Sequence, residues 1–210
     1  MSHVVLLGDS IFDNVAYVRG GPDVVAQLRE HLPEGWRATL AAVDGAVLSD
    51  VPRQLRSLPG DAAFLVVSVG GNDALGHVGI LEERARSVPE ALDRLAGIAE
   101  GFGGGYREML AHVLERGLPT ALCTIYHGNF PDPVMQRLTS TALTVFNDAI
   151  LRTAFAEGLP VLDLRLVCDA PEDYANPIEP SSRGGEKIAR GIARVVTEHD
   201  FARRRTEVFV

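Results

Sequence analysis

Short apolar runs alternate along this chain with longer amphipathic segments. Five runs have the length and apolar content of buried strands: residues 4–7, 37–42, 62–69, 119–124 and 160–164. Five segments have helical patterns: residues 22–31, 50–58, 83–116, 133–157 and 182–199. Strands that alternate with helices are typical of a parallel sheet with helices on both faces. We therefore expect an α/β fold built on a five-stranded parallel sheet.

Two of the helical segments carry further expectations. Gly101 and the glycines at 103–105 interrupt residues 83–116, so we expect a break or kink there. Residues 133–157 read as one long helix that Gly158 ends. Its apolar stripe is expected at Val134, Leu138, Ala142, Val145 and Ala149.

Composition narrows the class of protein. The chain has 210 residues, and 20 Lys and Arg against 28 Asp and Glu give a net charge of −8, which disfavours nucleic acid and anionic membrane surfaces as partners. We expect residues 1–210 to form a single globular domain. No apolar run approaches the roughly 20 residues of a membrane span, so we expect no membrane insertion and a cytoplasmic protein. Cys123 and Cys168 read as reduced core thiols, and no ligand spacing indicates a metal or another cofactor.

Candidate chemistry lies where three strands end, since ligands of parallel sheets bind beyond the carboxyl ends of the strands. Ser10 follows the first run in Gly-Asp-Ser and is well placed as a nucleophile. Gly45 follows the second run, and Asn72 follows the third in Gly-Gly-Asn-Asp. The Ser10 N–H, the Gly45 N–H and the Asn72 amide are three donors that together suit a tetrahedral oxyanion.

These blocks resemble the SGNH (GDSL) hydrolases, a family of esterases and acylhydrolases. The resemblance extends from residue 4 to about residue 195 and includes a last block, Asn-Pro-Ile-Glu-Pro-Ser-Ser-Arg-Gly at 176–184. It implies a three-layer α/β/α, flavodoxin-like sandwich. It also implies Ser10 as the nucleophile and an oxyanion hole of Ser10, Gly45 and Asn72. The implied substrate is a small-molecule ester of an acyl or acetyl group, with no cofactor.

The last block departs from the family pattern, in which Asp-x-x-His precedes Pro-Ser. Alignment on Pro180 and Ser181 places Asn176 at the Asp position and Glu179 at the His position. An ionised Glu only accepts hydrogen bonds, and we expect the Asn176 amide to donate one to it, where an Asp would add a like charge. Glu179, its pKa raised by partial burial, is then a candidate base for Ser10.

Alternatives remain open at this site. His127, which follows the fourth run, is a second candidate base. Loss of the usual His also fits a catalytically silent relative that binds a ligand in the same cleft. Clustered carboxylates of Asp9, Asp13, Asp73 and Glu179 are a further, weaker candidate for a cation site. We expect pocket walls from residues 11–22, 74–82 and 126–136. The sequence leaves the acyl group and the oligomeric state undetermined.

Overall fold

The computed structural model describes residues 2–210 and contains a parallel sheet of six strands in the order β2-β1-β3-β4-β5-β6. The strands are β1 (His3–Gly8), β2 (Arg37–Leu40), β3 (Phe64–Ser68), β4 (Thr120–Cys123), β5 (Val161–Leu162) and β6 (Val208–Phe209). All five expected strands are present, and the parallel α/β class is confirmed. The count of five was wrong, because β6 has only two residues and too little pattern to predict.

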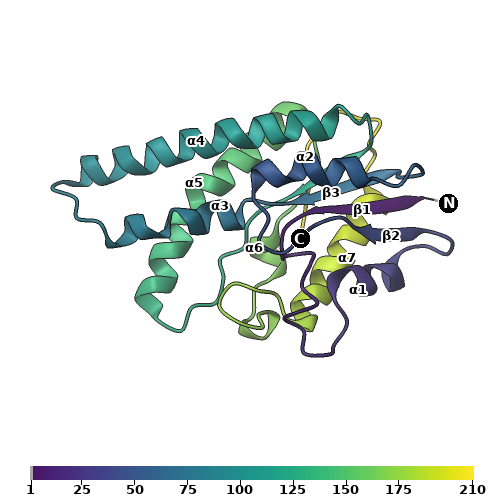
Figure 1. Cartoon of the computed structure of the whole chain (residues 1–210), viewed down its shortest axis with the longest axis horizontal. Coiled ribbons are helices and arrows are strands. Elements are labelled where there is room, and N and C mark those ends of the chain that lie inside the picture. Colours follow the sequence, from purple (N-terminus) through teal and green to yellow (C-terminus); the bar gives the residue numbers. More distant parts are fainter. Residues whose placement is uncertain (1) are drawn as a thin grey trace.

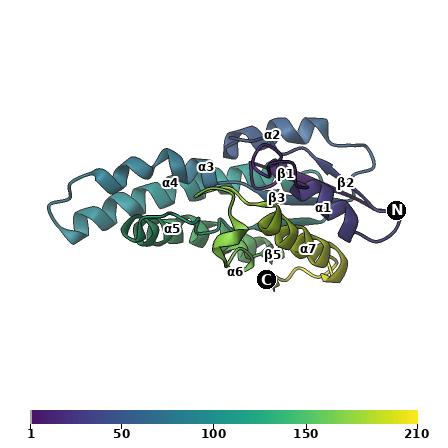
Figure 2. The same cartoon turned by 90° about the horizontal axis from the view of Figure 1, so that it is seen from below.

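Helices cover both faces of the sheet, as Figures 1 and 2 show. The α-helices are α1 (Val24–His31), α2 (Val51–Gln54), α3 (Gly71–Gly76), α4 (Val88–Leu114), α5 (Pro133–Glu157), α6 (Leu164–Val167) and α7 (Ser182–Glu198). Short 3-10 turns are η1 (Leu48–Asp50), η2 (Leu55–Ser57), η3 (Val78–Glu82) and η4 (Pro171–Asp173). The expected three-layer arrangement of helices, sheet and helices is therefore present.

Residues 4–7 of β1 form an unbroken apolar run because this part of the strand is buried on both faces. Val4 and Leu6 pack in a cluster with α1 and α7 on one face of the sheet. Val5 and Leu7 pack on the other face with α2, α4 and α5. Both faces are inaccessible to solvent, so alternating side chains must all be apolar.

Helix α4 is continuous through its glycines, and the expected break near residue 101 was wrong. A side chain at Gly105 would approach Leu48 to 3.4 Å, and one at Gly103 would lie 3.6 Å from Ala149 on α5. Phe102 and Tyr106 are buried between these contacts. Packing of the helix against its neighbours thus outweighs the weak helix propensity of glycine.

Helix α5 has the expected bounds but turns a different face to the core. Val134 and Leu138 are 49% and 42% exposed, whereas Phe146, Ile150 and Ala154 are buried. Helices α3, α4 and α5 reach past the edge of the sheet in Figures 1 and 2. The beginning of α5 therefore has no sheet to pack on, and the expected stripe of apolar residues was wrong there.

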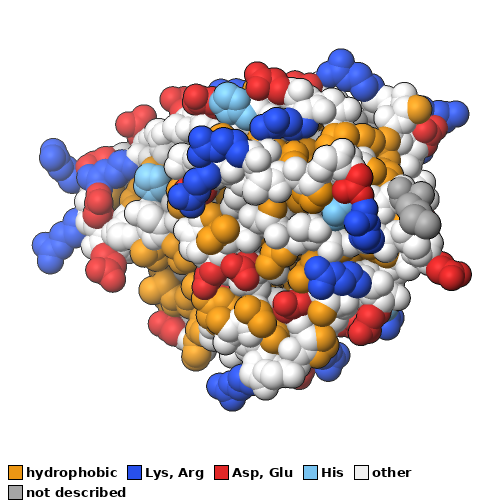
Figure 3. All heavy atoms as spheres, turned by 45° about the vertical axis from the view of Figure 1, so that its right-hand side comes forward, with side chains coloured by type: hydrophobic (Ala, Val, Ile, Leu, Met, Phe, Trp, Pro, Cys, Tyr) orange, Lys and Arg blue, Asp and Glu red, His pale blue; other side chains and the backbone are white. Residues whose placement is uncertain are grey.

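The surface charges, the two cysteines and the hydrophobicity of the helices can be compared with the expectations from sequence. In Figure 3, acidic and basic side chains are interspersed, with apolar side chains between them, so this face presents no single-sign field. Cys123 and Cys168 are free and buried, as expected. Among residues 2–210, no helix is both long and apolar enough to cross a membrane.

Candidate active site

A glycine turn presents Ser10 at the carboxyl end of β1. Gly8 has φ +126°, and a Cβ there would lie 1.7 Å from the Ser68 carbonyl oxygen, so only glycine fits. The Asp9 N–H donates to the same oxygen at 3.1 Å, and the Gln54 side chain bonds both the N–H and the C=O of Gly8 at 2.8 Å. The turn is held on both sides, so the position of Ser10 is well defined.

The Ser10 hydroxyl faces the carboxylate of Glu179. Ser10 Oγ donates to Glu179 Oε1 at 3.1 Å, and both residues are buried, with 7% and 6% of their surfaces exposed. The second carboxylate oxygen, Oε2, is buried and has no hydrogen-bond partner among the described residues. The fold thus brings together the two residues that the sequence analysis paired as nucleophile and base.

Burial shifts the proton affinity of this carboxylate. It raises the pKa of Glu179 to about 7, and the negative charge of Asp44 raises it further, while the hydrogen bond from Ser10 opposes the change. Removal of water disfavours the charged form of a carboxylic acid. Glu179 consequently exchanges its proton near neutral pH, which an exposed Glu does not.

Asp9, directly before Ser10, is a second buried acid. Burial raises the pKa of Asp9 to about 7, the N–H of Ile11 at 3.2 Å lowers it, and the charges of Glu179 and Asp73 raise it. Asp9, Ser10 and Glu179 all contribute atoms to the wall of one cavity. Two acids with a pKa of about 7 therefore line the same cavity as Ser10, and one of them, Glu179, contacts its hydroxyl.

Asn176 supports Glu179 by a different contact from the one expected. Its Oδ1 accepts the backbone N–H groups of Ile178 at 2.9 Å and Glu179 at 3.0 Å. The expected bond from the Asn176 amide to the carboxylate was wrong, because Oε1 of Glu179 pairs with Ser10 and Oε2 has no partner. Asn side chains bond readily to backbone two or three residues ahead, and this local turn orients the main chain at Glu179.

The loop around Glu179 is tied down by further hydrogen bonds. Its own carbonyl accepts the N–H of Ala175 at 2.8 Å, and the hydroxyl of Tyr126 donates to the Ile178 carbonyl at 2.6 Å. Asn129 N–H donates to the Pro177 carbonyl at 2.8 Å. These bonds connect the loop to the segment after β4, so Glu179 is held from two directions.

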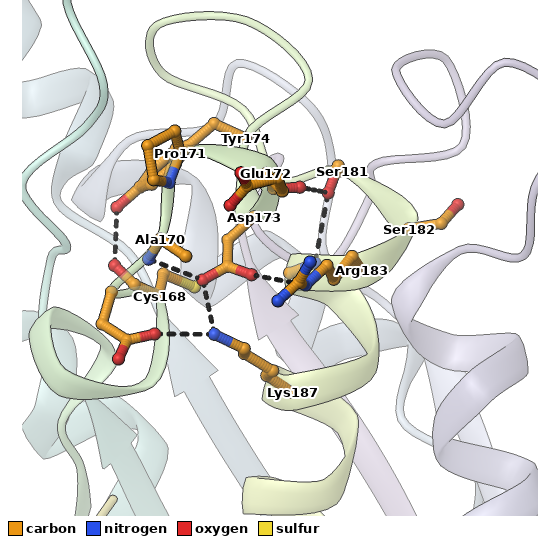
Figure 4. Close-up of polar contacts among 12 residues, drawn as sticks. Cys168, Ala170, Pro171, Glu172, Asp173, Tyr174, Ser181, Ser182, Arg183 and Lys187 are labelled. Carbon is orange, nitrogen blue, oxygen red and sulfur yellow. Dashed lines mark hydrogen bonds and ion pairs between the residues drawn. The ribbon is translucent and has the colours of Figure 1, made fainter.

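An ion-pair cluster around the buried Asp173, at the start of α7, anchors the other end of this loop (Figure 4). Asp173 is fully buried; its Oδ2 accepts Lys187 Nζ at 2.7 Å and the Ala170 N–H at 3.0 Å. The Asp173 carbonyl accepts the N–H of Ser181, and a side chain at Gly184 would lie 2.1 Å from that carbonyl oxygen. The cluster therefore fixes the position at which the segment that carries Glu179 enters α7.

The three expected oxyanion donors lie in different surroundings. Ser10 and Asn72 line the cavity, whereas Gly45, with φ +79°, belongs to the loop after β2 and is not a wall residue. Asn72 Nδ2 donates one bond to the Ala46 carbonyl at 3.0 Å, which leaves its second hydrogen. The backbone N–H groups of Ser10 and Gly45 donate to no other group within residues 2–210.

His127 lies in the same cavity wall but makes no described contact with Ser10. Burial lowers its pKa, and the nearby positive charge of Arg165 lowers it further. In this structure Glu179, and not His127, accepts the Ser10 hydroxyl. Among residues 2–210, no group of three or more His, Cys, Asp or Glu side chains could hold a metal ion. The carboxylates of Asp9, Asp13, Asp73 and Glu179 therefore do not form a cation site.

The cavity next to Ser10 is the feature that the sequence analysis described least well. It has a volume of about 410 Å³ and takes walls from residues 74–81 and 125–130, as expected. Of residues 11–22 only Ile11 contributes, and α4 and α5 supply walls that were not expected. A possible signal was α5 itself, which has apolar residues on more faces than a core stripe requires.

Comparisons with known proteins agree with this architecture. Residues 6–186 match the model of a family described as the GDSL-like Lipase/Acylhydrolase family. No protein of curated function matches the chain significantly in sequence.

Solved structures give the same picture of the fold. The lipase Lip_vut3 from a goat rumen metagenome superposes with a TM-score of 0.71 at 20% identity, over 96% of this chain and 100% of that one. An extracellular lipase from Streptomyces rimosus gives 0.66 at 18% identity, over 95% and 100%. Est24, a carbohydrate acetylesterase from Sinorhizobium meliloti, gives 0.61 at 14% identity, over 93% and 98%. The identities are low, so these likenesses establish the fold, while the family model covers most of the sequence: the chain belongs to the GDSL-like lipase/acylhydrolase family.

Proposed function

We propose that this protein hydrolyses carboxylic esters, with Ser10 as the nucleophile and Glu179 as the general base. The observation that carries the proposal is the hydrogen bond of 3.1 Å from Ser10 Oγ to Glu179 Oε1 inside a cavity. Asn176 and Glu179 take the positions at which the family pattern has Asp and His. A serine paired with a base in hydrogen-bond reach is the arrangement that nucleophilic catalysis requires.

Acylation follows from this geometry. Ser10 Oγ attacks the carbonyl carbon of the ester as its proton moves to Glu179 Oε1, and the carbonyl π bond becomes an oxyanion. Collapse of this intermediate breaks the bond to the leaving oxygen, which receives the proton from Glu179. The acyl group is then esterified to Ser10 and the alcohol departs.

Deacylation repeats the steps with water. Glu179 takes a proton from a water molecule as the water oxygen attacks the acyl carbon. The second intermediate releases Ser10 Oγ, which regains the proton from Glu179, and a carboxylic acid leaves. No net change of the protein or additional reactant is needed.

A carboxylate base changes the charge balance of the reaction. When Glu179 accepts the proton it becomes neutral, and the negative charge passes to the oxyanion. A histidine would instead become an imidazolium that an Asp must stabilise. Glu179 needs no such partner, which fits the neutral Asn176 and its role in backbone orientation.

The raised pKa supports Glu179 in this role. A base with its ordinary pKa of 4.5 would be a weak proton acceptor at neutral pH, whereas Glu179, with a pKa of about 7, is better matched. For the oxyanion, the free N–H groups of Ser10 and Gly45 and the second hydrogen of the Asn72 amide are the donors we propose.

Hydrolysis of p-nitrophenyl butyrate by the purified chain and by Ser10→Ala tests this function. We expect the parent to exceed the variant by at least about 100-fold in kcat/KM. A fluorophosphonate should label the parent on the peptide that contains Ser10. Equal rates and no labelling would contradict the proposal and favour a silent relative that binds a ligand.

A further inference from the structure

The cavity beside Ser10 extends away from the polar groups under helices of which only α3, through Asn72, carries a proposed catalytic residue. Its walls there come from α3, η3, α4 and α5, and α3, α4 and α5 project past the sheet in Figure 2. Ser10 and Glu179 belong to the same enclosure of about 410 Å³. A ligand bound in this space can therefore extend to the hydroxyl of Ser10.

Beyond Asn72, the polar side chains of these walls are His77 and Thr139, and the other side chains are apolar. The helix side chains that form the walls include Leu75, Leu95, Ile98, Leu143 and Phe146. The wall hydroxyl of Thr139 is used within α5, where it donates to the carbonyls of Met135 at 2.8 Å and Gln136 at 3.1 Å. This part of the cavity consequently suits a hydrocarbon and gives a sugar or a charged group few partners.

Apolar side chains also continue to the outside of the molecule. The wall residues Leu75 and Val78 are 39% and 46% exposed, and Ile178, next to Glu179, is 36% exposed. Exposed apolar groups in the rim of a cavity give a hydrocarbon a favourable path from solvent. The cavity is thus accessible as well as apolar.

We propose that this cavity binds the acyl chain of the substrate and that the enzyme prefers medium-chain esters, in the range of hexanoate to decanoate, over acetyl esters. The inference deepens the proposed function and rests on it. An acetyl group would leave the apolar space unfilled, whereas a longer chain buries each added methylene against the walls. Burial of a methylene favours binding about fourfold, which predicts a similar gain in kcat/KM for each one until the space is full.

Ala142 on α5 offers a direct test, since it lines the cavity with a small side chain. Rates are measured with p-nitrophenyl esters from acetate to dodecanoate for the parent and for Ala142→Phe. Ala111→Phe is the matched control, because Ala111 lies on the exposed face of α4 and outside the cavity wall. Leu143→Ala, which enlarges the cavity, guards against a folding failure of the first variant.

For the parent we expect octanoate to exceed acetate at least tenfold in kcat/KM. Ala142→Phe should lower the octanoate-to-acetate ratio at least tenfold, Leu143→Ala should move the optimum to longer chains, and Ala111→Phe should resemble the parent. An acetate preference, or ratios unchanged in both cavity variants, would overturn the inference and leave the esterase proposal intact.

A binding measurement separates this inference from a failure of catalysis. Calorimetry with Ser10→Ala should detect methyl octanoate binding at least tenfold tighter than methyl acetate, and Ala142→Phe in that background should abolish the difference. If the parent hydrolyses no ester but this binding holds, the cavity inference stands and the esterase proposal fails. If methyl octanoate shows no binding beyond that of methyl acetate, the cavity inference fails.

Discussion

Ser10 Oγ and Glu179 Oε1 lie 3.1 Å apart in a hydrogen bond that joins residues 169 positions apart in sequence. The bond uses one oxygen of the carboxylate and leaves the other, Oε2, buried without a partner. A buried acceptor without a donor is costly for a protein, and such exceptions are concentrated at functional sites. Four predictions about stability and pH follow from this pair and from the loops that hold it, before the direct test of the pair itself.

The first prediction concerns the pH dependence of ester hydrolysis. A base works only when ionised, so kcat/KM should rise with pH and level off above the pKa of Glu179, which burial raises to about 7. At pH 5 about 1% of such a group is ionised, which predicts a rate about 100-fold below the plateau. The profile is measured from pH 5 to pH 9 with a substrate that is stable across the range.

Asp44→Asn provides the matched arm of this experiment. The charge of Asp44 raises the pKa of Glu179, so its removal should move the midpoint of the profile to lower pH. Asp200→Asn, a distant and exposed change, should leave the midpoint in place. A midpoint near 4.5 in the parent would show that the base is not a buried carboxylate.

The second prediction concerns stability. The folded-state pKa of Glu179, about 7, lies above its ordinary value of 4.5, so the folded protein binds this proton more tightly than the unfolded chain. The stability that this provides is full below pH 4.5 and is lost as pH rises through 7. Glu179→Gln removes the titration and should therefore raise the free energy of unfolding at pH 8 by about 3 kcal/mol, with little effect at pH 5.

Urea unfolding at both pH values measures this difference. Glu100→Gln serves as the control, because Glu100 on α4 is exposed and does not line the cavity. A lower free energy of unfolding for Glu179→Gln than for the parent at pH 8 would contradict the claim that burial raises the pKa of Glu179.

The third prediction concerns the cluster that anchors the Glu179 loop. Lys187→Met leaves the buried carboxylate of Asp173 without its closest cation, although the Ala170 N–H remains. Because Lys187 is about one-third exposed, we expect a moderate loss of about 1–2 kcal/mol in unfolding free energy and a lower kcat. Arg190→Met breaks a surface pair with Glu186 on the same helix and should cost at most about 0.5 kcal/mol. Equal effects of Lys187→Met and Arg190→Met on stability and kcat would contradict the anchoring role of the Asp173 cluster.

The fourth prediction concerns the turn before the nucleophile. Gly8→Ala places a methyl group against the Ser68 carbonyl at a backbone angle that alanine avoids, so we expect a loss of more than about 3 kcal/mol and of all activity. Gly60→Ala, where a Cβ meets no atom within 4 Å, is the control and should melt like the parent. Thermal unfolding followed by circular dichroism distinguishes them.

The parts of the fold that could be predicted from sequence are those in which local pattern and packing agree. Residues 4–7 of β1 are all apolar because both faces of the strand are buried, and α5 runs from Pro133 to Glu157 because the proline begins it and Gly158 caps its end. Helix α4 could not be predicted through its glycines, since Gly105 and Gly103 pack against η1 and α5 and none of the glycines ends the helix. Strand β6 is too short to carry a pattern.

The site was predictable to a similar degree. The carboxyl ends of parallel strands share one edge, so the motif after the first strand was enough to predict Ser10 at the cleft. Glu179 follows no strand directly and was paired with Ser10 through the resemblance of residues 176–184 to the family's last block. The role of Asn176 was not predicted, since its side chain had both a carboxylate and two backbone N–H groups within reach and took the latter. The apolar cavity was also missed in part, because its walls come from helix faces whose exposure depends on where the sheet ends.

The central claim is that Glu179 takes the proton of Ser10, and the most direct test compares two isosteric or near-isosteric changes in the same cavity. Steady-state hydrolysis of p-nitrophenyl butyrate at pH 8 is measured for Glu179→Gln and for His127→Gln, with folding checked by circular dichroism. We predict that Glu179→Gln loses about 100- to 10,000-fold in kcat/KM while His127→Gln stays within about fivefold of the parent. A Glu179→Gln enzyme as fast as the parent, or a loss confined to His127→Gln, would contradict the account.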